Sequence, residues 1–268
     1  MCELLGMSCN TPTDLTFSFT GFSSRGGRTG PHGDGWGLAF FEGRASRVFL
    51  DPNPCCESPL AAFFRSHSVK TEIAVAHIRK RTHGPVGLAN THPFWREMWG
   101  RSWVFAHNGT LPGVESLALD RYNPIGETDS ERAFCWMLGQ ILREFHAYPG
   151  PEQLFAAVAR LGSELSERGV FNFLLSNGEY LFARCDTKLH HIIRKAPFGQ
   201  ATLADEDVTV DFSRVTTPDD RVAVVATTPL TRDEQWRKGE PGELWVFQRG
   251  ELVAELSSPV RHERKEHV

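Results

Sequence analysis

The sequence of 268 residues lacks any apolar run of about 18 residues, the length that a membrane-spanning helix requires. Its first residues also lack a basic segment followed by a long apolar stretch, so we expect no secretory signal. Positive charge is not in excess, because the formal net charge is −4. A field of that sign disfavours nucleic acid and anionic membrane surfaces. These absences predict a cytoplasmic protein that binds neither nucleic acid nor membrane.

Cysteine is sparse, and its spacing carries no metal or redox signature. The six cysteines include no C-x-x-C pair, so we expect neither a zinc finger nor a disulfide framework. Three histidines, His77, His83 and His92, have spacings that match neither the H-E-x-x-H motif nor a compact zinc site. A metallohydrolase built on them is the least favoured hypothesis. We therefore expect no metal and no cofactor.

The hydrophobic pattern changes along the chain from strands to helices and back to strands. This order predicts an α+β fold. The predicted strands cover residues 36–41, 47–50, 73–78, 103–106, 171–176, 180–184, 190–194, 222–226, 244–249 and 252–256, and helices are predicted at 59–66, from Thr128 and from Pro151. Asn177-Gly178 predicts a hairpin turn. No linker or repeat interrupts the chain, so we predict one domain over residues 1–268, with a frayed tail at 261–268.

Cys2 is distinguished by its position. Cysteine is a small residue, and an initiator methionine before it is normally removed. The mature chain would then carry a thiol with a pKa of about 8.5 beside an α-amine with a pKa of about 8. The amine suits the role of general base for its own side chain, so one residue can supply both nucleophile and base. The alternative is a small apolar residue at the start of a strand.

Three further sites carry polar groups that suit the binding of a charged or reacting group. Arg79, at the end of an apolar strand, is suited to clamp a carboxylate with its guanidinium fork. Asn108 and Gly109 either form a turn or supply an oxyanion hole from a side-chain amide and a backbone N–H. Asp129 is not needed for the capping pattern of Thr128 and Glu131, which leaves it to bind an ammonium group. The three glycines within residues 33–37 indicate tight backbone packing near a site.

Taken together, these motifs resemble the class II glutamine amidotransferases, whose glutaminase domains are of the N-terminal-nucleophile (Ntn) type. The matching motifs follow the family's order; they are Cys2, D-G-W-G at 34–37, Arg79 with T-H-G at 82–84 and N-x-H-P at 90–93, H-N-G at 107–109, and Asp129. They span residues 2–131. Within the family, the chain looks most like the stand-alone YafJ type, which has no synthase domain.

The resemblance implies a four-layer αββα sandwich of two antiparallel β-sheets and a role for each matching residue. Cys2, exposed by removal of Met1, would be the nucleophile, and Asn108 and Gly109 the oxyanion hole. Arg79, helped by Thr82 and His92, would bind the α-carboxylate of the substrate. Asp129 would hold its α-ammonium group. The implied reaction releases ammonia and glutamate from glutamine through a γ-glutamyl thioester.

One departure from the family pattern leaves the substrate open. Lys80 stands where the synthase-bearing members have an aromatic residue. An alternative is therefore a γ-glutamyl amidase that acts on a larger γ-glutamyl compound, with Lys80, Arg81 and residues 23–30 contacting the leaving group. A second alternative is a glutaminase or regulatory subunit of a separate synthase.

Overall fold

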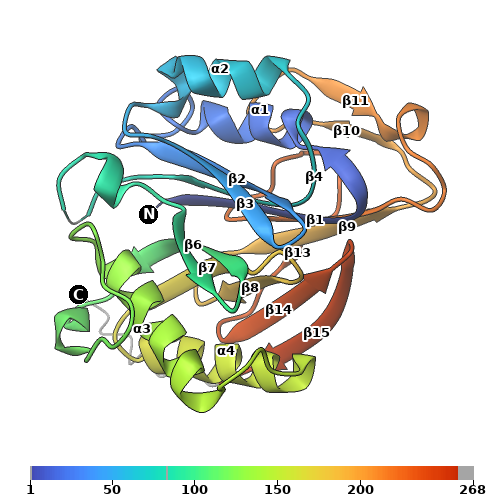
Figure 1. The fold of residues 1–268 in the computed structure, drawn as a ribbon. Coiled ribbons are helices and arrows are strands. Elements are labelled where there is room, and N and C mark those ends of the chain that lie inside the picture. Colours follow the sequence, from blue (N-terminus) through green and yellow to red (C-terminus); the bar gives the residue numbers. More distant parts are fainter. Residues whose placement is uncertain (1, 83, 259–268) are drawn as a thin grey trace, which may run out of the picture.

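Two antiparallel β-sheets stack face to face in the computed structural model, which describes residues 2–82 and 84–258. Figure 1 shows helices α1 and α2 above one sheet and α3 and α4 below the other. The predicted αββα sandwich is confirmed. Met1, His83 and the predicted frayed tail at 261–268 lie outside the described residues. Within the described part, no helix is long and apolar enough to cross a membrane.

The seven-stranded sheet has the strand order β13-β9-β12-β1-β4-β2-β3. Its strands are β1 (Glu3–Asp14), β2 (Trp36–Glu42), β3 (Ala45–Asp51), β4 (Lys70–Ile78), β9 (His190–Lys195), β12 (Arg221–Ala226) and β13 (Arg237–Lys238). Helices α1 (Thr16–Ser24) and α2 (Pro59–Ser66) cover its outer face. Strand β1 lies at the centre of the sheet, paired with β4 and β12. The start of the chain is therefore held on both sides.

The six-stranded sheet has the order β15-β14-β8-β7-β6-β5. Its strands are β5 (Phe94–Met98), β6 (Arg101–Thr110), β7 (Val170–Ser176), β8 (Leu181–Cys185), β14 (Glu243–Gln248) and β15 (Glu251–Ser257). Helices α3 (Asp129–Glu144) and α4 (Pro151–Ser166) cover its outer face. A small hairpin, β10 (Gln200–Thr202) with β11 (Thr209–Asp211), and four 3-10 turns, Cys55–Glu57, Leu88–Asn90, Val114–Ser116 and Phe212–Arg214, complete the described elements.

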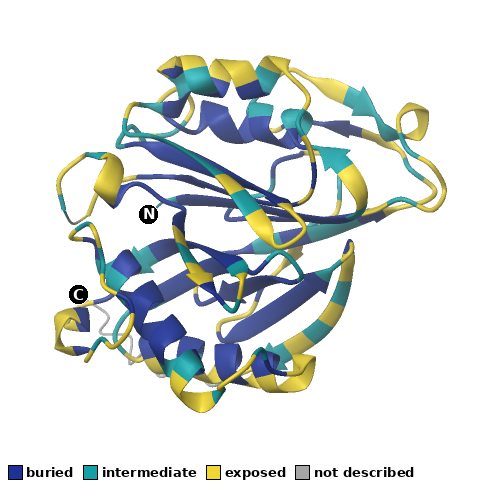
Figure 2. Ribbon diagram, in the orientation of Figure 1, coloured by how far each residue is buried: buried dark blue, intermediate teal, exposed yellow. Residues whose placement is uncertain are grey.

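Three apolar layers hold the sandwich together, and most strands contribute to two of them. The central strands are buried on both faces, whereas the edge strands β3 and β15 and the outward faces of the helices are partly exposed (Figure 2). On β6, Phe105 packs toward α3 while Val104 and Ala106 pack into the layer between the sheets. The two-residue period of a strand thus assigns every side chain to one layer. We call the middle one the inter-sheet layer.

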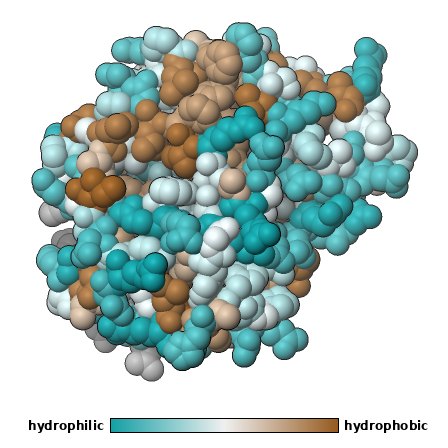
Figure 3. All heavy atoms as spheres, in the orientation of Figure 1, coloured by the Kyte–Doolittle hydropathy of each residue, from teal (hydrophilic) through white to brown (hydrophobic). Residues whose placement is uncertain are grey.

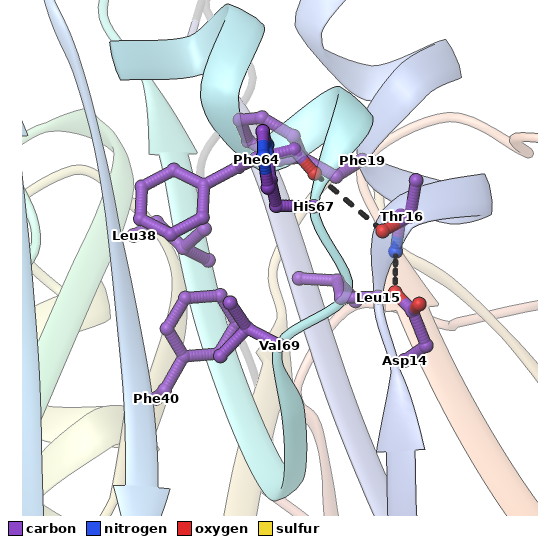
Figure 4. Close-up of a pocket in the computed structure, with 9 residues that line it drawn as sticks. All are labelled: Asp14, Leu15, Thr16, Phe19, Leu38, Phe40, Phe64, His67 and Val69. Carbon is purple, nitrogen blue, oxygen red and sulfur yellow. Dashed lines mark hydrogen bonds between the residues drawn. The ribbon is translucent and has the colours of Figure 1, made fainter.

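The outer layer beneath α1 and α2 is built on aromatic rings. The ring of Phe64 lies 6.3 Å from that of Phe19 and 5.5 Å from that of Phe40, centroid to centroid. Figure 4 shows these rings around a shallow pocket that Asp14 also lines. Apolar surface residues gather over α2 in Figure 3. Asp14 ends β1, so this pocket lies at the end of the strand opposite Cys2 and away from the predicted site.

One local alternative is excluded and one local prediction needs correction. Asn108 and Gly109 lie inside β6, which excludes the alternative of a turn at these residues. The capping box at Thr128 is half formed: its hydroxyl accepts from the N–H of Glu131 at 3.2 Å, but the Glu131 carboxylate accepts from the N–H of Gly126. The carboxylate also pairs with an arginine of β5, which draws it away from the backbone of Thr128.

Candidate functional site

Cys2 lies at the edge of the inter-sheet layer. Leu4 packs into this layer, and the strand period places Cys2, two residues earlier, on the same side. Its sulfur lies 3.3 Å from the backbone nitrogen of Lys80, whose N–H donates to it, and 3.4 Å from the Lys80 carbonyl oxygen. Pairing of Glu3 with Ile78 sets this contact. Burial raises the pKa of the thiol to about 11, although the Lys80 N–H lowers it.

Arg79 follows β4 on the same side as Cys2. Val75 of β4 packs into the inter-sheet layer, so Arg79, four residues on, faces it as well. Arg79 is 3% exposed, and its guanidinium donates to the carbonyl oxygens of Pro85 at 3.0 Å and Gly84 at 3.4 Å. Arg79 therefore anchors the loop at 84–85 beside the thiol.

The glycines of the D-G-W-G motif make room for this arrangement. The N–H of Arg79 donates to the carbonyl oxygen of Gly35 at 2.8 Å, and Gly35 has a φ of +111°. A Cβ atom at Gly37 would lie 2.3 Å from the carbonyl oxygen of His92. The predicted tight packing is therefore present, and it lets the segment at His92 cross beside β2.

Asn108 and Gly109 bring β6 to the same layer. Ala106 faces the inter-sheet layer, so Asn108 does too. The Nε2 atom of His77 lies 3.1 Å from the carbonyl oxygen of His107, which joins β4 to β6 across the layer. Asn108 is completely buried, and neither its amide nitrogen nor its amide oxygen has a hydrogen-bond partner. Such atoms in a native core call for a ligand or water.

Asp129 lies at the first residue of α3, and its carboxylate is held by the backbone. The N–H of Leu111 donates to Oδ2 at 2.7 Å, and the N–H of Ser130 donates to Oδ1 at 2.8 Å. The carboxylate raises the pKa of the Cys2 thiol, as a smaller influence than burial, so the two groups are within electrostatic range. Asp129 also lines a cavity of about 460 Å³, between residues 110–115 and 124–132. A small molecule can therefore reach it.

His77 and His92 form a stacked pair behind these groups. Their ring centroids are 4.1 Å apart, and both residues are buried. Burial lowers the pKa of His77 to about 3 and that of His92 well below its usual value. Both rings are therefore neutral near pH 7. Among the described residues, no group of three or more histidine, cysteine or acidic side chains is placed to hold a metal ion, and His83 lies outside them.

The structure brings most of the predicted site residues together. The sulfur of Cys2 contacts the backbone of Lys80, the residue after Arg79. Asn108 follows His107, whose carbonyl oxygen lies within hydrogen-bond distance of His77. Thr82 is exposed in the segment before Gly84, and its contact with a substrate stays a prediction.

A family model of the class II glutamine amidotransferases matches residues 1–268. This chain belongs to the class II glutamine amidotransferase family. It is 54% identical over 254 residues to the Escherichia coli protein named "Putative glutamine amidotransferase YafJ", covering 94% of this chain and all of that one. A crystal structure of a predicted glutamine amidotransferase from Pseudomonas aeruginosa superposes with a TM-score of 0.74 at 44% identity, covering 94% and 100% of the two chains.

A more distant structure supports the fold of this class II amidotransferase. The glutamine phosphoribosylpyrophosphate amidotransferase of Bacillus subtilis has a TM-score of 0.60 at 16% identity. The match covers 96% of this chain but 49% of that one. The likeness concerns the Ntn-type sandwich alone.

This amidotransferase also has site neighbours that the sequence analysis missed. The backbone of Lys80 contacts the thiol, and no side-chain motif can signal a backbone contact. Asn172 of β7 donates to the carbonyl oxygen of Asn108 at 3.0 Å. An asparagine within the apolar run of residues 170–175 was a usable signal. Arg25 bonds the carboxylate of Glu3 at 3.1 Å and so braces the residue after Cys2.

Proposed function

We propose that this chain is an Ntn amidohydrolase that cleaves the γ-amide of glutamine and releases ammonia and glutamate. The observation that carries the proposal is the unpartnered carboxamide of Asn108, buried on the layer that also holds the Cys2 thiol. A buried donor without a partner costs about 1–3 kcal/mol. An oxyanion that forms beside Cys2 would supply the missing partner for the Asn108 amide nitrogen.

In the proposed mechanism, removal of Met1 frees the α-amine of Cys2. Burial raises the thiol pKa to about 11, so the sulfur needs a base, and the α-amine takes its proton as the sulfur attacks the amide carbon. Asn108 and the N–H of Gly109 stabilise the tetrahedral oxyanion. The α-ammonium then protonates the departing nitrogen, ammonia leaves, and a γ-glutamyl thioester remains. Water, deprotonated by the same amine, attacks the thioester and yields glutamate and the free thiol.

Substrate recognition is assigned to the charged groups around the thiol. Arg79 binds the α-carboxylate of the substrate, and Asp129 binds its α-ammonium group. In this proposal Thr82 and His92 assist Arg79. Since His92 is buried and stacked on His77, it acts through the shape of the loop beside Arg79. The partners are then small molecules, and a separate synthase that consumes the ammonia is a further proposal.

The test is turnover by the processed protein together with labelling by an electrophilic glutamine analogue. Intact mass analysis should find a chain that begins at Cys2 and carries one label on it. Cys2→Ala should release glutamate and ammonia at no more than the background rate. Cys56→Ala, a matched change at another half-buried free thiol, should keep the rate of the parent protein. Unchanged release by Cys2→Ala would contradict the nucleophile assignment.

Lys80 favours a second candidate, a γ-glutamyl amidase. Its backbone contacts the sulfur of Cys2 while the residue itself is exposed, so its side chain is available to a larger leaving group. Comparing kcat/KM for glutamine with that for γ-glutamyl peptides distinguishes the two. A Lys80→Ala variant that loses turnover of peptides only would favour the amidase.

A further inference from the structure

A buried hydrogen-bond chain links Asp129 to β7 through two side chains that have no role so far. The Nε2 atom of His107 lies 3.0 Å from the carbonyl oxygen of Val170, and its Nδ1 atom lies 2.8 Å from the hydroxyl oxygen of Ser130. That oxygen lies 3.2 Å from Oδ1 of Asp129. His107 and Ser130 are both buried. The chain therefore runs behind the site, within the layer that packs against α3.

The chemistry of the groups fixes where the protons lie. A carbonyl oxygen only accepts, so Nε2 of His107 carries the proton. Burial lowers the pKa of His107, against an opposing rise from Asp129, and this favours the neutral ring, in which Nδ1 is an acceptor. The hydroxyl proton of Ser130 is therefore shared between two acceptors, Nδ1 of His107 at 2.8 Å and, more weakly, Oδ1 of Asp129 at 3.2 Å. The Asp129 carboxylate accepts from two backbone N–H groups, those of Leu111 and Ser130, and from the shared Ser130 hydroxyl, so its remaining lone pairs stay open to a cation.

Gly109 protects the same chain. A Cβ atom at this position would lie 1.8 Å from the carbonyl oxygen of Val170 and 2.7 Å from Nε2 of His107, the two atoms that bond to each other. Asn108 lies between His107 and Gly109 in sequence and faces the inter-sheet layer instead. The H-N-G motif thus serves two sites: His107 and Gly109 support Asp129, while Asn108 faces the thiol.

We propose that His107 and Ser130 are positioning residues that hold the Asp129 carboxylate open for a substrate with a free α-ammonium group. The inference rests on the proposed function, in which Asp129 binds that group. Loss of the Ser130 hydroxyl leaves Nδ1 of His107 without a donor and releases one constraint on Asp129. The effect should appear in ligand binding and only for ligands that carry the amine.

The experiment compares L-glutamine with glutaramate, the same molecule without its α-amine. Binding is measured by calorimetry on Cys2→Ala, with and without Ser130→Ala. We expect Ser130→Ala to raise the Kd for glutamine about fivefold, which corresponds to the loss of roughly one hydrogen bond. The Kd for glutaramate should not change. Ser130→Thr keeps the hydroxyl and should restore glutamine binding.

Ser166→Ala is the matched control. Ser166 is a buried serine of α4 whose hydroxyl bonds Asp186 at 3.1 Å and not His107 or Asp129, so its loss should not change the ratio of the two affinities. The positioning role would be overturned if Ser130→Ala raised the Kd of both ligands equally, or if the parent bound both ligands with the same Kd. Turnover separates the two proposals: a protein that discriminates the ligands yet releases no ammonia contradicts the hydrolase alone.

Discussion

The inter-sheet layer has two regions that the same strands supply. Its apolar region includes Leu4, Ala39, Val75, Val104, Ala106, Leu174, Leu181 and Val225. Its polar end consists of Cys2, His77, Arg79, His92 and Asn108. Strands β4 and β6 pass from one region to the other, and Cys2 directly precedes β1. A shift of a few residues along each strand therefore separates a packed core from a site.

The two regions differ in how completely they are filled. In the apolar region, a Cβ atom at Gly6 would lie 3.1 Å from Leu181 and 3.2 Å from Leu174, so the sheets are in close contact there. At the polar end, His77, His92 and Asn108 together leave five buried polar atoms without a partner in the described structure. Each unpartnered buried group costs about 1–3 kcal/mol. We infer that the apolar region stabilises the fold and offsets a polar end that the substrate completes.

Replacing Asn108 should separate activity from stability most clearly. Asn108→Leu has nearly the same volume but removes the unpartnered amide. We expect kcat to fall about 10²–10³-fold, as for loss of an oxyanion donor. The free energy of unfolding, measured in urea, should rise by about 1–3 kcal/mol because two buried polar atoms are removed.

Asn108→Asp is the matched control for this change. It keeps the shape but replaces the donor with an acceptor, so it should lose activity to a similar extent. Wild-type kcat in Asn108→Leu would contradict the oxyanion role. An unchanged or lower free energy of unfolding in Asn108→Leu would contradict the idea that the unpartnered amide lowers the stability of the polar end.

A cavity in the apolar region should lower the stability of the protein and leave its activity unchanged. Leu174 is fully buried between the sheets, so Leu174→Ala should lower the free energy of unfolding by about 2–5 kcal/mol. Its kcat with glutamine should stay near the parent value, because Leu174 belongs to the apolar region. Leu88→Ala, at an exposed leucine, is the control and should change neither quantity. A large loss of kcat in Leu174→Ala would show that the two regions are not separable.

Most of the fold could be predicted because periodicity and breakers mark it. The helix at 59–66 has the predicted bounds, and the hairpin at Asn177 forms with its side-chain oxygen accepting from two backbone N–H groups. Strand β1 was missed because residues 3–9 are buried on both faces and show no alternation. Helix α1 was missed because Thr16–Ser24 is rich in serine, threonine and phenylalanine, which are weak helix formers.

The candidate site could be located from the sequence, but the contacts around it could not. Motifs carry Cys2, Arg79 and Asp129, and the roles proposed for these residues stay predictions. Ser130 could not, since a serine after a helix N-cap is ordinary, and its contact with His107 depends on how α3 packs against β6. Tertiary packing alone brings these two residues together, so no local sequence pattern reports the bond.

The smallest expected effect is the part of the pH dependence of stability that His77 contributes at the polar end. Burial lowers the folded-state pKa of His77 to about 3, below an unfolded value of about 6.5. The unfolded chain therefore binds the proton first, and stability is present above about pH 6.5 and lost as the pH falls toward 3. For His77 the loss of stability between about pH 7 and pH 5 is about 2 kcal/mol.

His77→Gln, which keeps a donor for the carbonyl of His107, should remove this part of the pH dependence, as measured from urea midpoints at both pH values. His146→Gln, at an exposed histidine, should keep the parent slope, and Leu174→Ala should lower stability equally at both values. A His77→Gln slope equal to that of the parent would mean that His77 is already protonated in the folded protein, and the polar end would then hold a charge that Arg79 opposes.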